Sequence, residues 1–97
     1  MEIKDVIWLD DIVAKIETKH GVATWEAEEV LLSNPEFRRG GKGRRKGEDL
    51  YYALGRTDAG RYLFIVFIRK PGSKALVISA RAMSEREKRG YRQRRRN

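Results

Sequence analysis

The residue of this sequence best placed for chemistry is Arg81, which lies between an apolar stretch and a helix-start signal. Val77 and Ile78 are typical of a buried strand. Ser84 and Glu87 have the spacing of a capping box, which predicts that a helix begins there. The flanking elements should therefore hold the backbone of Arg81, and a guanidinium held in this way binds phosphate oxygens two at a time. The pattern predicts an anionic substrate or partner.

Further arginines extend this cationic cluster. Arg61 begins the longest apolar stretch, and Arg86 and Arg89 lie in the helix that follows Arg81. We expect them to converge if the strand ends and the helix line one edge of a sheet. Metal-free RNA cleavage requires cations for the charge that develops on the phosphate, together with a base and an acid. Arginines remain protonated, so they would stabilise charge and position the phosphate.

Proton transfer requires other residue types. Glu87 and Tyr91 are four residues apart and share one helix face, which makes them a candidate acid–base pair. His20 is a third candidate, because imidazole titrates near neutral pH. Each has a structural alternative: Glu87 as the capping-box residue, Tyr91 as a packing anchor and His20 as the end of a helix.

The elements that must position these residues begin with an amphipathic helix. Residues 1–8 are compatible with either a short strand or an arm. An apolar stripe with helical spacing then runs from Leu9 to Ile16, and Gly21 follows where a left-handed C-cap is needed. We therefore expect a first helix from Leu9 to about His20.

A second helix follows directly. Thr24 is its expected N-cap, and Asn34–Pro35 ends it. Its inward face is expected to consist of Ala27, Val30 and Leu31. Both tryptophans, Trp8 and Trp25, are expected in the core.

The remainder predicts an antiparallel meander of three strands, or four if Phe37 begins another. The strands are residues 50–54, 61–69 and 75–80, and turn residues separate them. Residues 61–69 are apolar on both faces and should form the central strand. Residues 38–47 contain four glycines and six basic residues, which predicts a mobile basic loop.

The predicted fold is a single α+β domain over residues 1–97, with two N-terminal helices, the meander and a basic C-terminal helix. Met83 and Tyr91 are the expected anchors of that last helix. Residues 92–97 are expected to form a flexible basic tail that orders only against a partner.

The net charge of +8 is unevenly distributed. Residues 1–37 hold three Lys/Arg and nine Asp/Glu, a charge of −6, whereas residues 38–97 hold nineteen and five, a charge of +14. The basic part suits nucleic acid or an acidic protein segment. Its expected RNA contacts are Arg38, Arg39, Lys42, Arg44, Arg45, Lys46, Arg56, Arg86 and Arg89.

Composition also excludes several classes of protein. No cysteine is present, so disulfides and zinc–thiolate sites are impossible, and one histidine excludes a multi-histidine metal site. We expect neither a metal nor another cofactor, because 97 residues form a small core without room for a deep cofactor cavity. The apolar run 62–68 is too short to span a bilayer. The charged N-terminus is unlike a secretion signal, and we expect a cytoplasmic protein.

Several motifs together resemble the BrnT-like toxin family. They are Lys19-His-Gly-Val22 before a Trp/Glu helix, Asn34-Pro35, Gly55-x-Thr-x-x-Gly-Arg61, Ile78-Ser-Ala-Arg81 and Glu87-Lys-x-x-Tyr91. The resemblance covers nearly the whole chain. Two features depart from the family pattern: the residues after Trp8 lack a Lys-Asn pair, and residues 38–46 are unusually basic.

The resemblance implies a RelE-like, metal-independent endoribonuclease toxin of a bacterial type II toxin–antitoxin pair. Such a toxin inhibits translation by cutting RNA, free or on the ribosome, and a protein antitoxin neutralises it in a hetero-oligomer. Arg61 and Arg81 match the arginines of the family, Glu87 and Tyr91 its final-helix pair, and His20 its Lys-His-Gly histidine. Two alternatives stay open: a nucleic-acid-binding module without catalysis, and an interaction protein whose basic helix binds an acidic partner.

Overall fold

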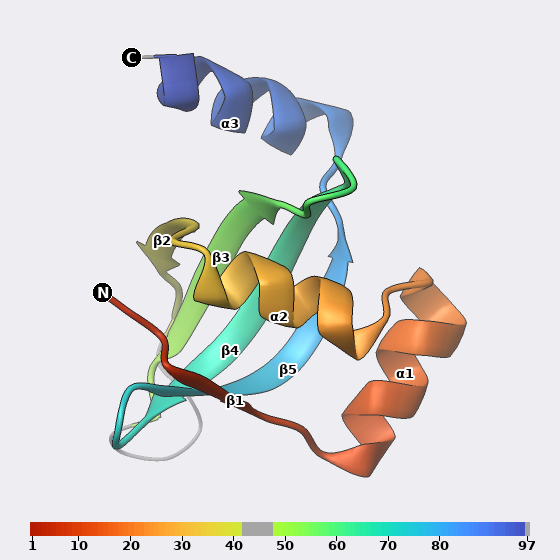
Figure 1. Cartoon of the computed structure of the whole chain (residues 1–97), viewed down its shortest axis with the longest axis vertical. Helices are drawn as coiled ribbons and strands as arrows, with labels where there is room; N and C mark the ends of the chain where they lie inside the picture. The colour runs from red at the N-terminus through yellow and green to blue at the C-terminus, as the bar shows by residue number, and fades with distance from the viewer. Residues whose placement is uncertain (42–47, 97) are drawn as a thin grey trace.

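The computed structural model describes residues 1–41 and 48–96. Its fold is α+β, with a five-stranded mixed sheet in the order β1-β5-β4-β3-β2 (Figure 1). The strands are β1 (Asp5–Ile7), β2 (Glu36–Arg39), β3 (Leu50–Arg56), β4 (Tyr62–Lys70) and β5 (Lys74–Ala82). The helices are α1 (Asp10–His20), α2 (Thr24–Leu32) and α3 (Glu85–Arg96). Strands β2 to β5 form the antiparallel meander that the sequence predicts.

The N-terminal segment, for which the sequence left a short strand or an arm open, supplies a fifth strand. β1 pairs with β5 in parallel, with Val6 opposite Ala75. This pairing satisfies backbone groups along the edge of β5, which would otherwise be exposed. β1 reaches only Lys74 to Leu76, so the far end of β5, which leads into α3, pairs with β4 alone.

β4 is the central strand, as predicted, because it pairs with both β3 and β5. Its alternate residues Leu63, Ile65 and Phe67 are fully buried and share one cluster with apolar residues of α1 and α2. The residues from α2 are the predicted ones, Ala27, Val30 and Leu31. Both helices therefore cover the same face of the sheet (Figure 1).

The boundary between α1 and α2 differs from the prediction by one residue. α1 ends as expected at Gly21, whose φ is 60°. The expected cap of α2, Thr24, is instead its first helical residue, and Ala23 occupies the N-cap position. Glu26 fixes the start of α2 at this position, because its carboxylate accepts a hydrogen bond from the N–H of Ala23 at 3.0 Å.

The prediction that both tryptophans lie in the core is wrong for Trp25, which is 56% exposed. Trp25 precedes the buried Ala27 by two residues, a rotation of about 200° that places it on the opposite side of α2. Trp8 is half-buried, and its indole N–H donates to Glu28 at 2.8 Å.

The other face of the sheet carries a smaller cluster of Leu54, Met83 and Tyr91. The expected anchors of α3 are confirmed, because Met83 and Tyr91 are 9% and 8% exposed. α3 lies beyond one end of the sheet, away from α1 and α2 (Figure 1). No helix in the described ranges has the length and apolar character to cross a membrane.

Where the structure describes the basic segments, parts of them belong to regular elements. Arg38 and Arg39 belong to β2 rather than to a loop, because they pair with Tyr52 and Tyr51 of β3. Lys42, Arg44, Arg45 and Lys46 lie outside the described residues. The expected flexible tail continues α3 as far as Arg96. Arg95 helps to hold this last turn, since it donates to the hydroxyl of Tyr91 and to the carbonyl of Asn34.

Candidate active site

Arg81 is the centre of the candidate site, and β5 holds its backbone. It is the penultimate residue of β5 rather than part of a separate joint, and it pairs with Phe64 of β4. Its guanidinium lies over the Phe64 ring, 4.3 Å from the centroid. The two terminal nitrogens of the guanidinium donate to the two carboxylate oxygens of Glu87 at 2.8 and 2.9 Å. Together these contacts hold the guanidinium as a fixed fork at the sheet end.

Glu87 combines the ion pair with the predicted capping box. Its Oε1 accepts the N–H of Ser84 at 2.8 Å, while its own N–H donates to the Ser84 hydroxyl at 3.1 Å. The hydrogen bond from Arg81 is the main reason that the pKa of Glu87 falls from 4.5 to about 2, with the backbone N–H of Ser84 contributing. The same hydrogen bond raises the pKa of Arg81. At neutral pH the Glu87 carboxylate is therefore ionised, and both of its oxygens already accept hydrogen bonds. We call Arg81, Phe64 and Glu87 the Arg81 site.

Tyr91 lies four residues after Glu87 in α3. Its contacts indicate a packing role. Its ring packs edge-on against Tyr62, with centroids 6.0 Å apart. Its hydroxyl accepts a hydrogen bond from Nε of Arg95 at 3.2 Å. Tyr91 faces a hollow that it shares with Arg56 and Tyr62, whereas Glu87 faces a different one.

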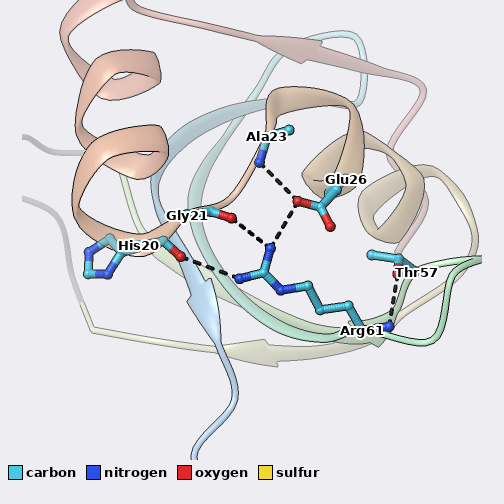
Figure 2. Close-up of polar contacts among 6 residues, drawn as sticks. All are labelled: His20, Gly21, Ala23, Glu26, Thr57 and Arg61. Carbon is cyan, nitrogen blue, oxygen red and sulfur yellow. Dashed lines mark hydrogen bonds and ion pairs between the residues drawn. The ribbon is translucent and has the colours of Figure 1, made fainter.

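Arg61 occupies the turn before β4 and connects it to the helices. Figure 2 shows its guanidinium between the α1–α2 joint and Glu26. One nitrogen donates to the Gly21 carbonyl at 2.7 Å and to the Glu26 carboxylate at 3.0 Å. The other donates to the His20 carbonyl at 3.4 Å, and the His20 ring lies on the far side of its backbone from Arg61 (Figure 2).

The expected convergence of Arg61 with Arg81 is absent, and His20, the third proton-transfer candidate, lies on the Arg61 side. Arg61 reaches the face of the sheet that α1 and α2 cover. Arg81 lies opposite Phe64, which alternates along β4 with the buried Leu63 and therefore faces the other side. Arg61 therefore lies beside the His20 backbone on one side of the sheet, and Arg81 lies on the other side.

A groove beside the Arg81 site collects three of the expected RNA-binding residues. It has a volume of 440 Å³ and lies between α3 and the sheet. Its lining comprises Arg38, Leu54, Phe64, Arg86, Glu87, Arg89, Gly90, Gln93 and Arg94. We call it the α3 groove.

Glu36 organises one side of the α3 groove. It accepts Nε of Arg38 at 2.8 Å and Nε of Arg94 at 2.6 Å. These two arginines lower the pKa of Glu36, more than offsetting the opposing effect of burial. Glu36 thus stays ionised and fixes both cations.

Two other expected RNA contacts, Arg39 and Arg56, lie outside this groove. Arg39 forms an ion pair with Asp49 and lies near the Tyr51 ring, and Arg56 lies over the Tyr62 ring. In the described part of the chain, no group of three or more His, Cys, Asp or Glu side chains is placed to hold a metal ion.

Phe64 and Gln93 were missed by sequence reasoning. Phe64 resembles a core residue of an apolar strand, and only its pairing with Arg81 moves it to the site. The available signal was alternation, because residues 63, 65 and 67 already supply one buried face. Gln93 carries no signal apart from its spacing of seven residues from Arg86.

Fold and site together define a small α+β domain with an arginine-rich groove at the junction of a strand and a helix. Residues 8–87 match the family model described as "Ribonuclease toxin, BrnT, of type II toxin-antitoxin system". The chain belongs to this BrnT toxin family. The match ends at Glu87, so most of α3 lies beyond it.

A solved structure confirms the fold. The chain is similar to the crystal structure of the Brucella abortus ribonuclease toxin BrnT, with a TM-score of 0.59 and 18% sequence identity. The similarity covers 84% of this chain and 97% of the Brucella chain. No curated protein matches this sequence.

Proposed function

We propose that this chain is a metal-independent endoribonuclease toxin that acts at the Arg81 site. It would inhibit translation in the cytoplasm by cutting RNA, and a protein antitoxin would neutralise it. The observation that carries the proposal is the bidentate pair of Arg81 with Glu87, next to a groove rimmed by further arginines. A guanidinium fork suits a phosphate diester, and the neighbouring carboxylate is a proton acceptor.

The proposed reaction begins with an exchange of partners. An RNA phosphate binds Arg81 and releases Glu87 from the ion pair. The pKa of Glu87 then rises toward its ordinary value, because the main cause of its depression is gone. A carboxylate with a higher pKa is a better general base.

The released Glu87 accepts the proton of the ribose 2′-hydroxyl. The 2′-oxygen attacks phosphorus, the bond to the 5′-oxygen breaks, and the leaving oxygen takes a proton from water. The products are a 2′,3′-cyclic phosphate and a 5′-hydroxyl. Arg81 stabilises the negative charge that develops on the phosphate oxygens.

A second candidate is a nucleic-acid-binding module without cleavage. It is favoured by the low pKa of Glu87, about 2, since such a carboxylate is a poor base until Arg81 leaves it. In that case the arginines hold phosphates and no bond is broken.

Incubation of the purified protein with RNA in the presence of a chelator distinguishes the two. The nuclease predicts cleavage that Arg81→Ala abolishes and Glu87→Gln strongly reduces. Arg69→Ala is the matched control, because Arg69 is an exposed arginine in the part of β4 far from the Arg81 site. Salt-sensitive binding without cleavage by the folded wild type would favour the module.

Expression in bacteria tests the toxin assignment. We expect growth arrest with the wild type, rescue by the neighbouring reading frame and no arrest with Arg81→Ala. Normal growth despite soluble, folded wild-type protein would count against a toxin.

A further inference from the structure

One face of α3 lines the α3 groove with polar and basic side chains. Arg86, Arg89 and Gln93 have the spacing i, i+3 and i+7, which puts them on one helix face, and all three line the groove. Gly90 lies in the same lining. A glycine in mid-helix costs about 1 kcal/mol relative to alanine, in a helix that has only one buried residue. Its place over the groove keeps the space between α3 and the sheet open.

The cations of the α3 groove are of two kinds. Arg38 and Arg94 are both held by Glu36. Arg86 and Arg89 are exposed, and neither has an ion-pair or hydrogen-bond partner among residues 1–41 and 48–96. Two unpaired guanidinium groups on one helix face are suited to an anionic ligand.

The sheet side of the α3 groove is apolar and aromatic. Leu54 and Phe64 contribute to its lining, and the Phe64 ring also contacts Tyr52, with centroids 5.0 Å apart. Flat, apolar surface beside unpaired cations is the combination that binds single-stranded nucleic acid. The amide of Gln93 adds both a donor and an acceptor, which can pair with the edge of a base.

We propose that the α3 groove is a nucleotide subsite, in which a base lies against the side of the groove lined by Leu54 and Phe64 and contacts Gln93, while its phosphate binds Arg86 and Arg89. This subsite rests on the proposed function, because it would hold a nucleotide next to the phosphate bound at Arg81. It makes Gln93 a specificity-determining residue. A volume of 440 Å³ fits a small ligand such as one nucleotide.

The first test is titration of the protein with each of the four 5′-mononucleotides, with NMR signals observed from the Leu54 methyl groups and the Gln93 amide. We expect the nucleotides to shift both signals, because a bound base adds its ring current above Leu54. Ribose 5-phosphate and inorganic phosphate should leave the Leu54 signal in place. Equal shifts with ribose 5-phosphate, or a Leu54 shift only with an acidic peptide, would overturn the subsite.

The second test is Gly90→Leu, which fills the groove while improving helix propensity. The added Cβ meets only the end of the flexible Arg94 side chain, at 2.9 Å, so the fold should tolerate the change. We expect the affinity for a short RNA to fall about tenfold, which is within the range for loss of a stacked base. Arg69→Gln is the control for general electrostatics. Unchanged RNA affinity in folded Gly90→Leu would refute the proposal.

Cleavage data separate the two proposals. If the wild type cuts RNA and Gln93→Ala alters the preferred base, both are supported. If the wild type cuts RNA but Gln93→Ala and Gly90→Leu change neither base preference nor KM, the nuclease stands and the subsite is refuted. Nucleotide-induced shifts in a protein that never cleaves RNA would support the subsite and refute the nuclease.

Discussion

Glu87→Gln is expected to remove a pH-dependent part of the stability while leaving the fold of α3 in place. Glutamine serves in a capping box as glutamate does, so the hydrogen bond to the Ser84 N–H is retained. What disappears is the charge that pairs with Arg81 at 2.8 and 2.9 Å. The variant therefore isolates the electrostatic contribution of the Arg81 site.

The magnitude follows from the pKa of Glu87. A decrease from 4.5 to about 2 corresponds to about 3 kcal/mol of preference for the ionised form in the folded protein. The Arg81 side chain is 39% exposed, so solvent screening reduces the expected loss at neutral pH to about 1–2 kcal/mol. Because the folded-state pKa is lowered, this stability is present above 4.5 and is lost as the pH falls through about 2.

The assay is urea unfolding followed by tryptophan fluorescence and circular dichroism, from about pH 7 down to about pH 3. The free energy of unfolding of the wild type should approach that of Glu87→Gln as the pH falls. Glu85→Gln is the control, since it removes the same charge from an exposed position in the first turn of α3. A wild-type-to-variant difference that stays constant across this range would refute the reasoning.

Two further predictions concern the sheet end. Arg61→Ala should lower the free energy of unfolding by about 1–3 kcal/mol in urea titrations, because it leaves Glu26 and the Gly21 carbonyl without this cation. The cleavage rate per folded molecule should fall far less in Arg61→Ala than in Arg81→Ala. An equal loss of rate in both variants would show that Arg61 also takes part in cleavage. Gly55→Ala should destabilise by about 1–3 kcal/mol, since its Cβ would lie 2.7 Å from Cγ1 of Val30. Thermal melts with Gly41→Ala as control, where a Cβ meets nothing within 4 Å, test this, and equal melting temperatures would contradict it.

Local patterns in the sequence predicted most of the elements. The periodic stripe, the left-handed cap at Gly21 and the capping box at Ser84 each depend on residues close in the chain. The same holds for the meander, because its strands follow one another through short turns. Trp25 was misplaced because hydrophobicity alone does not define the phase of a helix face, whereas the buried Ala27, Val30 and Leu31 do.

The sequence by itself determined the separation of charge, the arginine and the capping box at the end of β5, and the motifs that resemble the family. Only the tertiary structure decided which of these residues meet. Arg61 and Arg81 reach the same sheet end, but side chains alternate across a sheet, so one joins α1 and α2 while the other meets Phe64 and Glu87. Likewise, the pairing of Arg86 and Gln93 with Phe64 around one groove depends on how α3 docks through Tyr91. No local sequence pattern predicts contacts between segments that are distant in the chain, because these contacts depend on how complete elements pack.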